Sequence, residues 1–155
     1  MRFLTIAPLA IAMSITTANA EIKWNNASRP YLVARSDEPE SDASLRALCR
    51  TADAIEVRVG GREQVGKGKG DAVRLRFVSD GQQADVRGVS RRSDDFEMTA
   101  GTELVTELKA SDPLFGVLRL GKPVTLSGSL KKTVTWAPSN MASAVKDFLT
   151  ACTGN

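Results

Sequence analysis

The middle of the chain alternates apolar and charged residues with a period of two. Residues 55–59 are Ile-Glu-Val-Arg-Val, and residues 73–78 are Val-Arg-Leu-Arg-Phe-Val. Successive side chains of a strand point to opposite faces, so this pattern predicts strands with one buried and one solvated face. Antiparallel sheets commonly leave one face in water. The chain is therefore expected to be built around a mostly antiparallel β-sheet.

Turn residues and shorter apolar segments extend the predicted sheet. Gly60-Gly61 and Ser79-Asp80-Gly81 supply turn chemistry. The polar, acidic segment from Ser36 to Asp42 is predicted to be a loop. Further strands are expected at residues 31–34, 84–89, 96–99, 104–108, 124–127 and 133–136.

Helical patterns follow in the last third of the chain. Asp112-Pro113 before an apolar run, with Gly121 after it, predicts a short helix with an aspartate N-cap. A second helix is expected near the C-terminus, capped by Ser139 or Asn140 and followed by Gly154. Its apolar face consists of Met141, Val145, Phe148, Leu149 and Cys152.

A short helix is also expected before the sheet. It would start near Ser41 and place Leu45, Leu48 and Cys49 on one face. The predicted fold class is therefore α+β: a mostly antiparallel sheet flanked by two or three short helices.

The first twenty residues, MRFLTIAPLAIAMSITTANA, have the three parts of a secretory signal peptide. Arg2 is the positive charge, residues 3–15 form the apolar run, and Ala18-Asn19-Ala20 is the cleavage signal. The apolar run is shorter than the roughly 20 residues of a membrane-spanning helix, and Pro8 disfavours the alternative of a buried helix. We expect cleavage after Ala20, leaving residues 21–155 as a single domain, periplasmic or secreted, of a bacterial protein with no membrane span.

The chain has two cysteines, Cys49 and Cys152. Their separation excludes a CxxC redox pair or a zinc knuckle. In an oxidising compartment an isolated pair predicts a structural disulfide, here joining the N- and C-terminal helices. Closing a loop of about a hundred residues is worth on the order of 4 to 5 kcal/mol of loop-closure entropy. The alternative is two buried free thiols.

The chain contains no histidine. This excludes a Ser-His-Asp triad, a Cys-His nucleophile and histidine-ligated zinc or copper. With both thiols in a disulfide, thiolate catalysis is not expected either. We expect no catalytic residue, no metal and no cofactor.

A near match to a phosphate-binding loop lies between two predicted strands. Gly61-Arg-Glu-Gln-Val-Gly66-Lys67 has the glycine and lysine spacing of a P-loop, but Gly68 stands where Ser or Thr should bind magnesium. The segment does not open a helix. We therefore interpret Gly66-Lys-Gly-Lys-Gly70 as a flexible, basic hairpin tip.

Acidic residues gather after residue 93. Glu103 and Glu107 have the same parity, so they would share one face of a continuous strand. Two carboxylates can hydrolyse a glycosidic bond, but a solvated acidic edge has the same pattern, and nothing singles out a buried member. The cluster consists of Asp94, Asp95, Glu97, Glu103 and Glu107.

The formal net charge of +3 is unevenly distributed. Residues 50–92 contain ten basic and six acidic residues. Arg74 and Arg76 share a strand face, and Arg58 is expected on the neighbouring strand. A cationic face could bind lipid A phosphates, anionic cell-wall polymers or an acidic protein; alternatively it is the solvated side of the sheet. Nucleic acid is not expected, because the segment's only aromatic residue faces the core. The candidate basic binding face consists of Arg58, Arg74, Arg76, Lys67 and Lys69.

The last part of the chain resembles small exported proteobacterial proteins. The motifs are Gly121-Lys-Pro-Val-Thr-Leu-Ser127, Thr133-Val-Thr-Trp136 and a terminal helix with Ala144, Phe148 and Cys152. They are similar to the C-terminal pattern of the invasion-associated locus B family and of VasI-like proteins associated with type VI secretion. The resemblance implies an envelope or secretion accessory role without catalysis and assigns no functional residue.

These features lead to three functional hypotheses. The first is an exported, non-enzymatic envelope or secretion accessory protein that binds a protein or anionic envelope partner through the basic face. The second is a periplasmic inhibitor of a secreted or host enzyme such as a lysozyme, with a loop at Gly61–Gly70 or Ser90–Asp95 entering the target's cleft. The third is a small carboxylate-dependent hydrolase.

Overall fold

The computed structural model describes residues 22–27, 31–36, 43–51, 53–61, 63–136 and 140–154. The predicted signal peptide and its cleavage site lie outside these residues. Of the loop predicted at Ser36–Asp42, Ser36 belongs to a strand and residues 37–42 are outside the described part.

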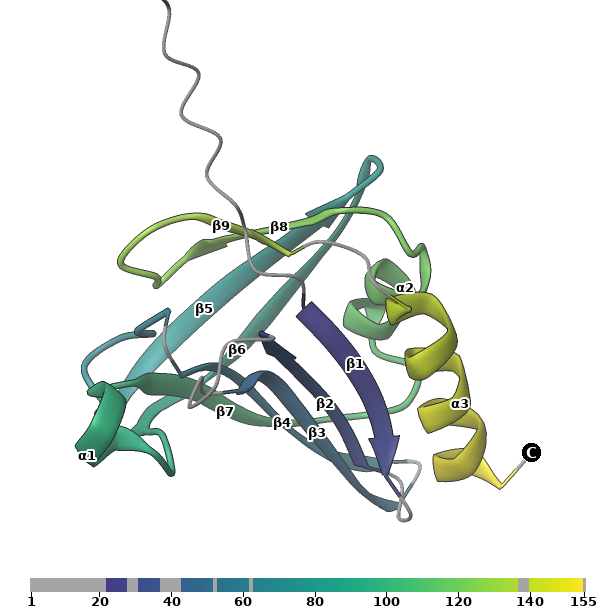
Figure 1. Cartoon of the computed structure of the whole chain (residues 1–155), viewed down its shortest axis with the longest axis horizontal. Helices are drawn as coiled ribbons and strands as arrows, with labels where there is room; N and C mark the ends of the chain where they lie inside the picture. Colours follow the sequence, from purple (N-terminus) through teal and green to yellow (C-terminus); the bar gives the residue numbers. More distant parts are fainter. Residues whose placement is uncertain are drawn as a thin grey trace, which may run out of the picture.

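The described residues form one antiparallel sheet of nine strands, in the order β1-β2-β3-β4-β7-β6-β5-β8-β9 (Figure 1). This confirms the expectation of a mostly antiparallel sheet, although the sheet has more strands than expected. The strands are β1 (Ile22–Ala27), β2 (Tyr31–Ser36), β3 (Ala43–Thr51), β4 (Ala54–Gly61), β5 (Lys69–Ser79), β6 (Gln82–Arg92), β7 (Thr102–Leu108), β8 (Val124–Gly128) and β9 (Val134–Trp136). The helices are α1 (Phe96–Thr99), α2 (Pro113–Arg119) and α3 (Met141–Thr153).

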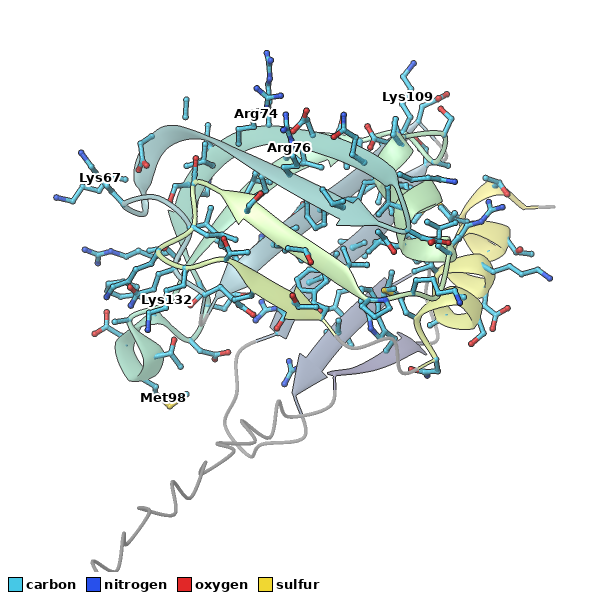
Figure 2. All side chains as sticks on the ribbon, turned by 90° about the horizontal axis from the view of Figure 1, so that it is seen from above. Lys67, Arg74, Arg76, Met98, Lys109 and Lys132 are labelled. Carbon is cyan, nitrogen blue, oxygen red and sulfur yellow. A yellow bond between two sulfur atoms is a disulfide. The ribbon has the colours of Figure 1, made fainter. Side chains whose placement is uncertain are left out.

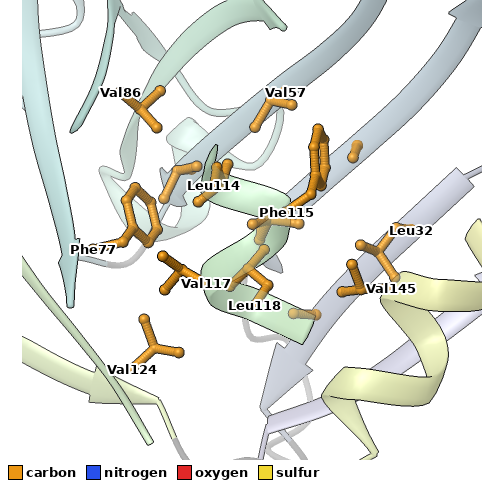
Figure 3. Packing of buried hydrophobic residues seen from close by; sticks show 14 of the residues in the cluster. Leu32, Val57, Phe77, Val86, Leu114, Phe115, Val117, Leu118, Val124 and Val145 are labelled. Carbon is orange, nitrogen blue, oxygen red and sulfur yellow. The ribbon is translucent and has the colours of Figure 1, made fainter. Parts of the chain in front are cut away.

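The inner face of the sheet and two of the helices enclose the core. In β5 the exposed and buried positions alternate strictly from Ala72 to Ser79, so Leu75 and Phe77 are fully buried. Helix α2 contacts β5, β6 and α3, and α3 contacts β1, β2 and β3. Figure 3 shows Leu114 and Phe115 of α2 among side chains from several strands. The two helices therefore cover one end of the core beneath the sheet.

The predicted start of α2 is confirmed. Pro113 is its first residue, and the Asp112 side chain accepts the backbone N–H of Leu114 at 2.9 Å. The predicted end of α3 is confirmed as well, because Gly154 follows it with a φ of 72°. Asn140 precedes α3, but its side chain makes no cap hydrogen bond to the helix.

The sheet curls so that its two edge strands approach each other. The indole rings of Trp24 in β1 and Trp136 in β9 meet edge to face, with centroids 5.9 Å apart. The side-chain amide of Asn140 accepts the Trp24 N–H at 3.1 Å and donates to the Trp24 carbonyl at 2.7 Å. An asparagine side chain thus takes the place of a neighbouring strand at this point of β1.

Removing the Asn140 side chain should destabilise the protein. In Asn140→Gly the buried Trp24 peptide groups lose both partners, which we expect to lower the free energy of unfolding by about 1 to 3 kcal/mol. Glycine adopts the positive φ of 45° at this position without strain, whereas alanine does not. The free energy of unfolding of Asn140→Ala should therefore be roughly 1 kcal/mol lower than that of Asn140→Gly. Urea unfolding followed by tryptophan fluorescence measures both. A glycine variant as stable as the wild type would show that the amide contributes nothing.

The prediction of a helix starting near Ser41 is wrong, because residues 43–51 form strand β3. Leu45 and Ala47 face the core, whereas Arg46 between them is half-buried on the outer face. The strand pairs on both sides, with β2 and with β4. Backbone pairing with two neighbours has overridden the helical spacing of the leucines and cysteine.

The strand expected at residues 96–99 is also wrong. These residues form the single turn of α1, where the Asp95 carbonyl accepts N–H groups from Met98 and Thr99.

The prediction that the basic segment Gly66–Gly70 is a hairpin tip is also wrong. Strand β4 pairs with β3 and β7, whereas β5 pairs with β6 and β8, so β4 and β5 do not form a hairpin. The segment instead leads from β4 past the end of β7 to β5, and the Val65 N–H donates to the Thr102 carbonyl.

Cys49 and Cys152 form a disulfide with Cα atoms 5.7 Å apart. The pairing is as predicted, but the elements it joins are not two helices. The bond ties strand β3 to the last turn of α3. The C-terminal helix is thereby fixed to the sheet that it covers.

Candidate functional site

The residues of the predicted basic face lie in three places rather than on one surface. Arg58 is in β4, and Arg74 and Arg76 are in β5, but β7 and β6 lie between these strands. The expectation that Arg58 is on the neighbouring strand is therefore wrong. Lys67 and Lys69 lie before and at the start of β5; Figure 2 shows Lys67 beyond one end of the molecule and Arg74 and Arg76 rising from the outer face. Sequence alternation places side chains on a face, but it does not give the strand order.

Arg58 belongs to a cluster in which carboxylates outnumber arginines. Its guanidinium donates to Glu56 at 2.8 Å, to Glu103 at 3.2 Å and to Asp94 at 3.3 Å. Arg46, directly opposite on β3, also binds Asp94. We call this cluster the Arg58 network; it consists of Arg46, Arg50, Glu56, Arg58, Asp94, Asp95 and Glu103.

The pKa values of Glu103 and Glu56, two carboxyls of this network, are shifted in opposite directions. Only 3% of the Glu103 side chain is exposed, and this burial raises the pKa of its carboxyl despite the nearby Arg58. The pKa of Glu56 is lowered, chiefly by a hydrogen bond from Arg50 and secondly by one from Arg58. The network holds a buried carboxyl whose charge depends on Arg58.

The acidic residues predicted to cluster lie in different places and in different environments. A hollow of about 160 Å³ beside the Arg58 network is lined by Glu56 and Asp94, but both bind Arg58, and a general acid needs a raised pKa, opposite to that of Glu56. Glu103 and Glu107 do share a strand, β7, and their positions, four apart, place their Cα atoms about 13 Å from each other. Glu97 lies apart from both, on α1.

The outer face of β5 and β6 carries a different balance of charge. Arg74 lies directly opposite Arg87, and Lys69 opposite Arg91, whereas Arg76 lies opposite a carboxylate, that of Asp85. Like charges directly opposite in a sheet are destabilising, so both cross-strand pairs cost stability. We call this surface the basic ribbon; it consists of Lys69, Arg74, Arg76, Arg87 and Arg91.

Asp85 neutralises part of the basic ribbon. It accepts from Arg76 at 3.0 and 3.3 Å and from Arg74 at 2.6 Å, and these bonds hold the pKa of its carboxyl far below its usual range. Among the described residues, no carboxylate is within ion-pair distance of Arg87 or Arg91. Arg91 lies across from Glu103, but that carboxylate binds Arg58. The ribbon therefore keeps an excess of positive charge exposed to solvent.

A hollow of about 310 Å³ opens beside Arg74 and Arg76, toward β8. Ser127, Gly128 and Ser129 line its other side. Gly128 has a φ of 110°, and a Cβ there would lie 2.4 Å from the Arg74 carbonyl, so only glycine lets β8 approach β5 this closely. Ser127 lies directly across from Arg76.

The segments proposed to enter a target's cleft are tied to the sheet. Gly66 donates its N–H to the Ser129 carbonyl, and the carboxylate of Asp71 accepts the backbone N–H groups of Lys67 and Lys69. The amides of this P-loop-like segment thus have a partner within the chain. In the second segment, Asp94 binds Arg46 and Arg58. Both segments are therefore held in place by contacts with the rest of the described structure.

Sequence reasoning missed part of the basic ribbon and all of the β8 wall. Arg87 has the parity of an outward position in the predicted strand at 84–89, so alternation could have identified it. Ser127 and Ser129 carry no such signal, because their place beside Arg74 and Arg76 depends on the pairing of β8 with β5.

Comparisons of the chain with protein-family models, with curated proteins and with solved structures found no match. Among the described residues, no helix has both the length and the apolar character needed to cross a bilayer. In the same residues, no group of three or more acidic or cysteine side chains is arranged to hold a metal ion.

Proposed function

We propose that the protein is an exported, non-catalytic accessory protein of the bacterial envelope or of a secretion system, and that it holds an anionic partner on the basic ribbon. The partner is a protein or an envelope polymer or lipid with clustered negative charge. Export is supported by the signal-like first twenty residues and fits a disulfide-linked domain.

The observation that carries this proposal is the pairing of like charges across β5 and β6. Arg74 opposite Arg87 and Lys69 opposite Arg91 repel each other in the free protein. An anion placed between them relieves that repulsion and gains from several cations at once. The Arg58 network, in contrast, has its own carboxylates and needs no external anion.

Reversing charges that make no internal ion pair tests the proposal. In Arg87→Glu/Arg91→Glu we expect partner binding to weaken at least 30-fold near 0.15 M salt, from about 1 kcal/mol for each cation near an anionic surface. The matched control is Lys109→Glu/Lys146→Glu, which changes the net charge equally at exposed positions that do not belong to the ribbon. The measurement is recovery of partners from a crosslinked envelope fraction, followed by affinity as a function of salt.

The control variant should recover the same partners as the wild type, and the ribbon variant should lose them. Wild-type binding should weaken as salt rises, because exposed charges are screened. Equal recovery by both variants would refute the assignment of the basic ribbon.

A further inference from the structure

We propose that the hollow between Arg74, Arg76, Ser127 and Ser129 is a subsite for a phosphate ester group of the anionic partner. This inference rests on the proposed function and makes it more specific. We call the hollow the phosphate subsite. It has the guanidiniums of β5 on one side and, on the other, the hydroxyl groups of Ser127 in β8 and of Ser129 just after it. The Asp85 carboxylate of β6 also lines the hollow, where it binds both arginines.

The charged side of the subsite has donors to spare. Each guanidinium carries five N–H groups in a fixed fork. Asp85 accepts one hydrogen bond from Arg74 and two from Arg76. Most of the N–H groups are therefore left for a ligand, while Asp85 holds both side chains in place. Fixing the arginines in advance reduces the entropy lost when an anion binds.

The opposite side supplies neutral donors. The Ser129 hydroxyl accepts the Arg74 backbone N–H at 3.1 Å, so its own hydrogen remains free to donate. Ser127 is half-buried directly across from Arg76, and no described residue bonds its hydroxyl. Hydroxyl groups that line a hollow beside two guanidiniums can rotate to donate to an oxyanion, whereas the guanidiniums repel a cation.

The arrangement of donors favours a tetrahedral anion over a carboxylate. One guanidinium fork satisfies both oxygens of a planar carboxylate, as Arg76 does with Asp85. A phosphate ester has additional oxygens pointing in other directions, and the serine side of the hollow can bind these. Two arginines and Asp85 leave a charge of +1, which Arg87 opposite Arg74 increases. This matches the charge of a phosphodiester or a monoester.

The test compares two anionic polymers on the purified protein, sodium polyphosphate and poly-L-glutamate with the same number of charges. The variant Ser127→Ala changes no charge, and Arg76→Lys keeps the charge but loses the fork. We expect each to weaken polyphosphate binding about tenfold. Because a guanidinium fork also binds a carboxylate, only Ser127→Ala should change polyglutamate binding by less than about twofold. Ser111→Ala, at an exposed serine away from the ribbon, is the control and should match the wild type.

The outcomes separate this inference from the proposed function. If both polymers bind the wild type equally and Ser127→Ala changes neither affinity, the phosphate subsite is refuted while a general anionic surface remains. If neither polymer binds, and Arg87→Glu/Arg91→Glu keeps its envelope partners, both proposals fail. Unchanged amide chemical shifts of Ser127, Gly128 and Ser129 on addition of polyphosphate would also overturn the subsite.

Vesicles distinguish the possible sources of the phosphate. Phosphatidylglycerol vesicles present a phosphodiester at a membrane surface, and phosphatidylcholine vesicles lack its net negative charge. Binding to the first alone, weakened by Ser127→Ala, supports the subsite with a lipid as source. Binding to polyphosphate but to neither vesicle supports it with a non-lipid phosphate ester as source.

Discussion

Replacing both cysteines, in Cys49→Ala/Cys152→Ala, is expected to lower the free energy of unfolding by about 4 kcal/mol. The bond joins residues 103 positions apart. Without it the unfolded chain gains the entropy of an open loop of that length, which loop-closure arguments put at about 4.7 kcal/mol for a hundred residues, and measured values are often smaller. Urea unfolding of variant and wild type measures the difference.

Loss of the bond should also act locally on α3. The helix packs Val145 and Phe148 into the core, with the Phe148 ring 6.2 Å from that of Phe115 in α2, and the disulfide holds its last turn to β3. We therefore expect amide hydrogens of α3 to exchange faster in the variant than those of β5 and β6. The single variant Phe148→Ala is a useful comparison, because it weakens the packing and keeps the bond.

Two results would contradict this account of the disulfide. One is a double variant within 1 kcal/mol of the wild type, against the roughly 4 kcal/mol expected. The other is the reaction of two thiols with Ellman's reagent in the unfolded, unreduced protein, because an intact bond leaves none to react.

The strands of this fold could be predicted where the sequence itself contains the alternation. Val73 to Val78 and Ile55 to Val59 show it clearly, and both are strands with the expected buried side. Leu45, Leu48 and Cys49 have helical spacing, whereas Ala43, Leu45, Ala47 and Cys49 of the same short segment alternate as in a strand. Only the pairing of β3 with β2 and β4 decides between them.

The candidate site could be predicted only in part, because it depends on strand order. Arg74 and Arg76 were identified from their shared face in one strand. Their neighbours could not be identified, since β4 and β5 are consecutive in sequence but separated in the sheet by β7 and β6. For the same reason Glu103 gives no sign of burial in the sequence: its environment comes from Arg58 on β4 and from the β6–β7 connection, which carries Asp94.

Removing the Arg58 side chain by Arg58→Met is expected to destabilise the protein by about 3 kcal/mol at pH 7. The variant leaves the Glu103 carboxylate buried without its ion-pair partner, and breaking a buried pair in this way costs about 3 to 5 kcal/mol. We expect a cost at the lower end of this range, because a third of the Arg58 side chain is exposed to solvent and because Arg46, which also attracts the Glu103 carboxylate, remains in the variant. Arg91→Met, which removes an arginine without an ion pair, is the control and should stay within about 0.5 kcal/mol.

The loss should depend on pH in a defined direction. Burial already raises the pKa of Glu103 above its ordinary value of 4.5, and removal of Arg58 raises it further. Between the pKa of the unfolded chain and that of the folded protein, the folded state holds more protons, so stability falls as the pH rises through this window. Below the unfolded pKa the carboxyl is neutral in both states. The deficit of Arg58→Met relative to the wild type should therefore be small at pH 4 and full at pH 7.

The double variant Arg58→Met/Glu103→Gln separates loss of an ion pair from loss of packing. It removes both charges, so it should recover to within about 1 kcal/mol of the wild type, because a buried pair contributes little net stability compared with uncharged residues of similar size. Urea unfolding of wild type, single and double variants at pH 4 and pH 7 completes the cycle. A deficit of Arg58→Met that is equal at both pH values, or that the second substitution does not reduce, would show that Arg58 stabilises the sheet through its contacts with Glu56 and Asp94 rather than by compensating Glu103.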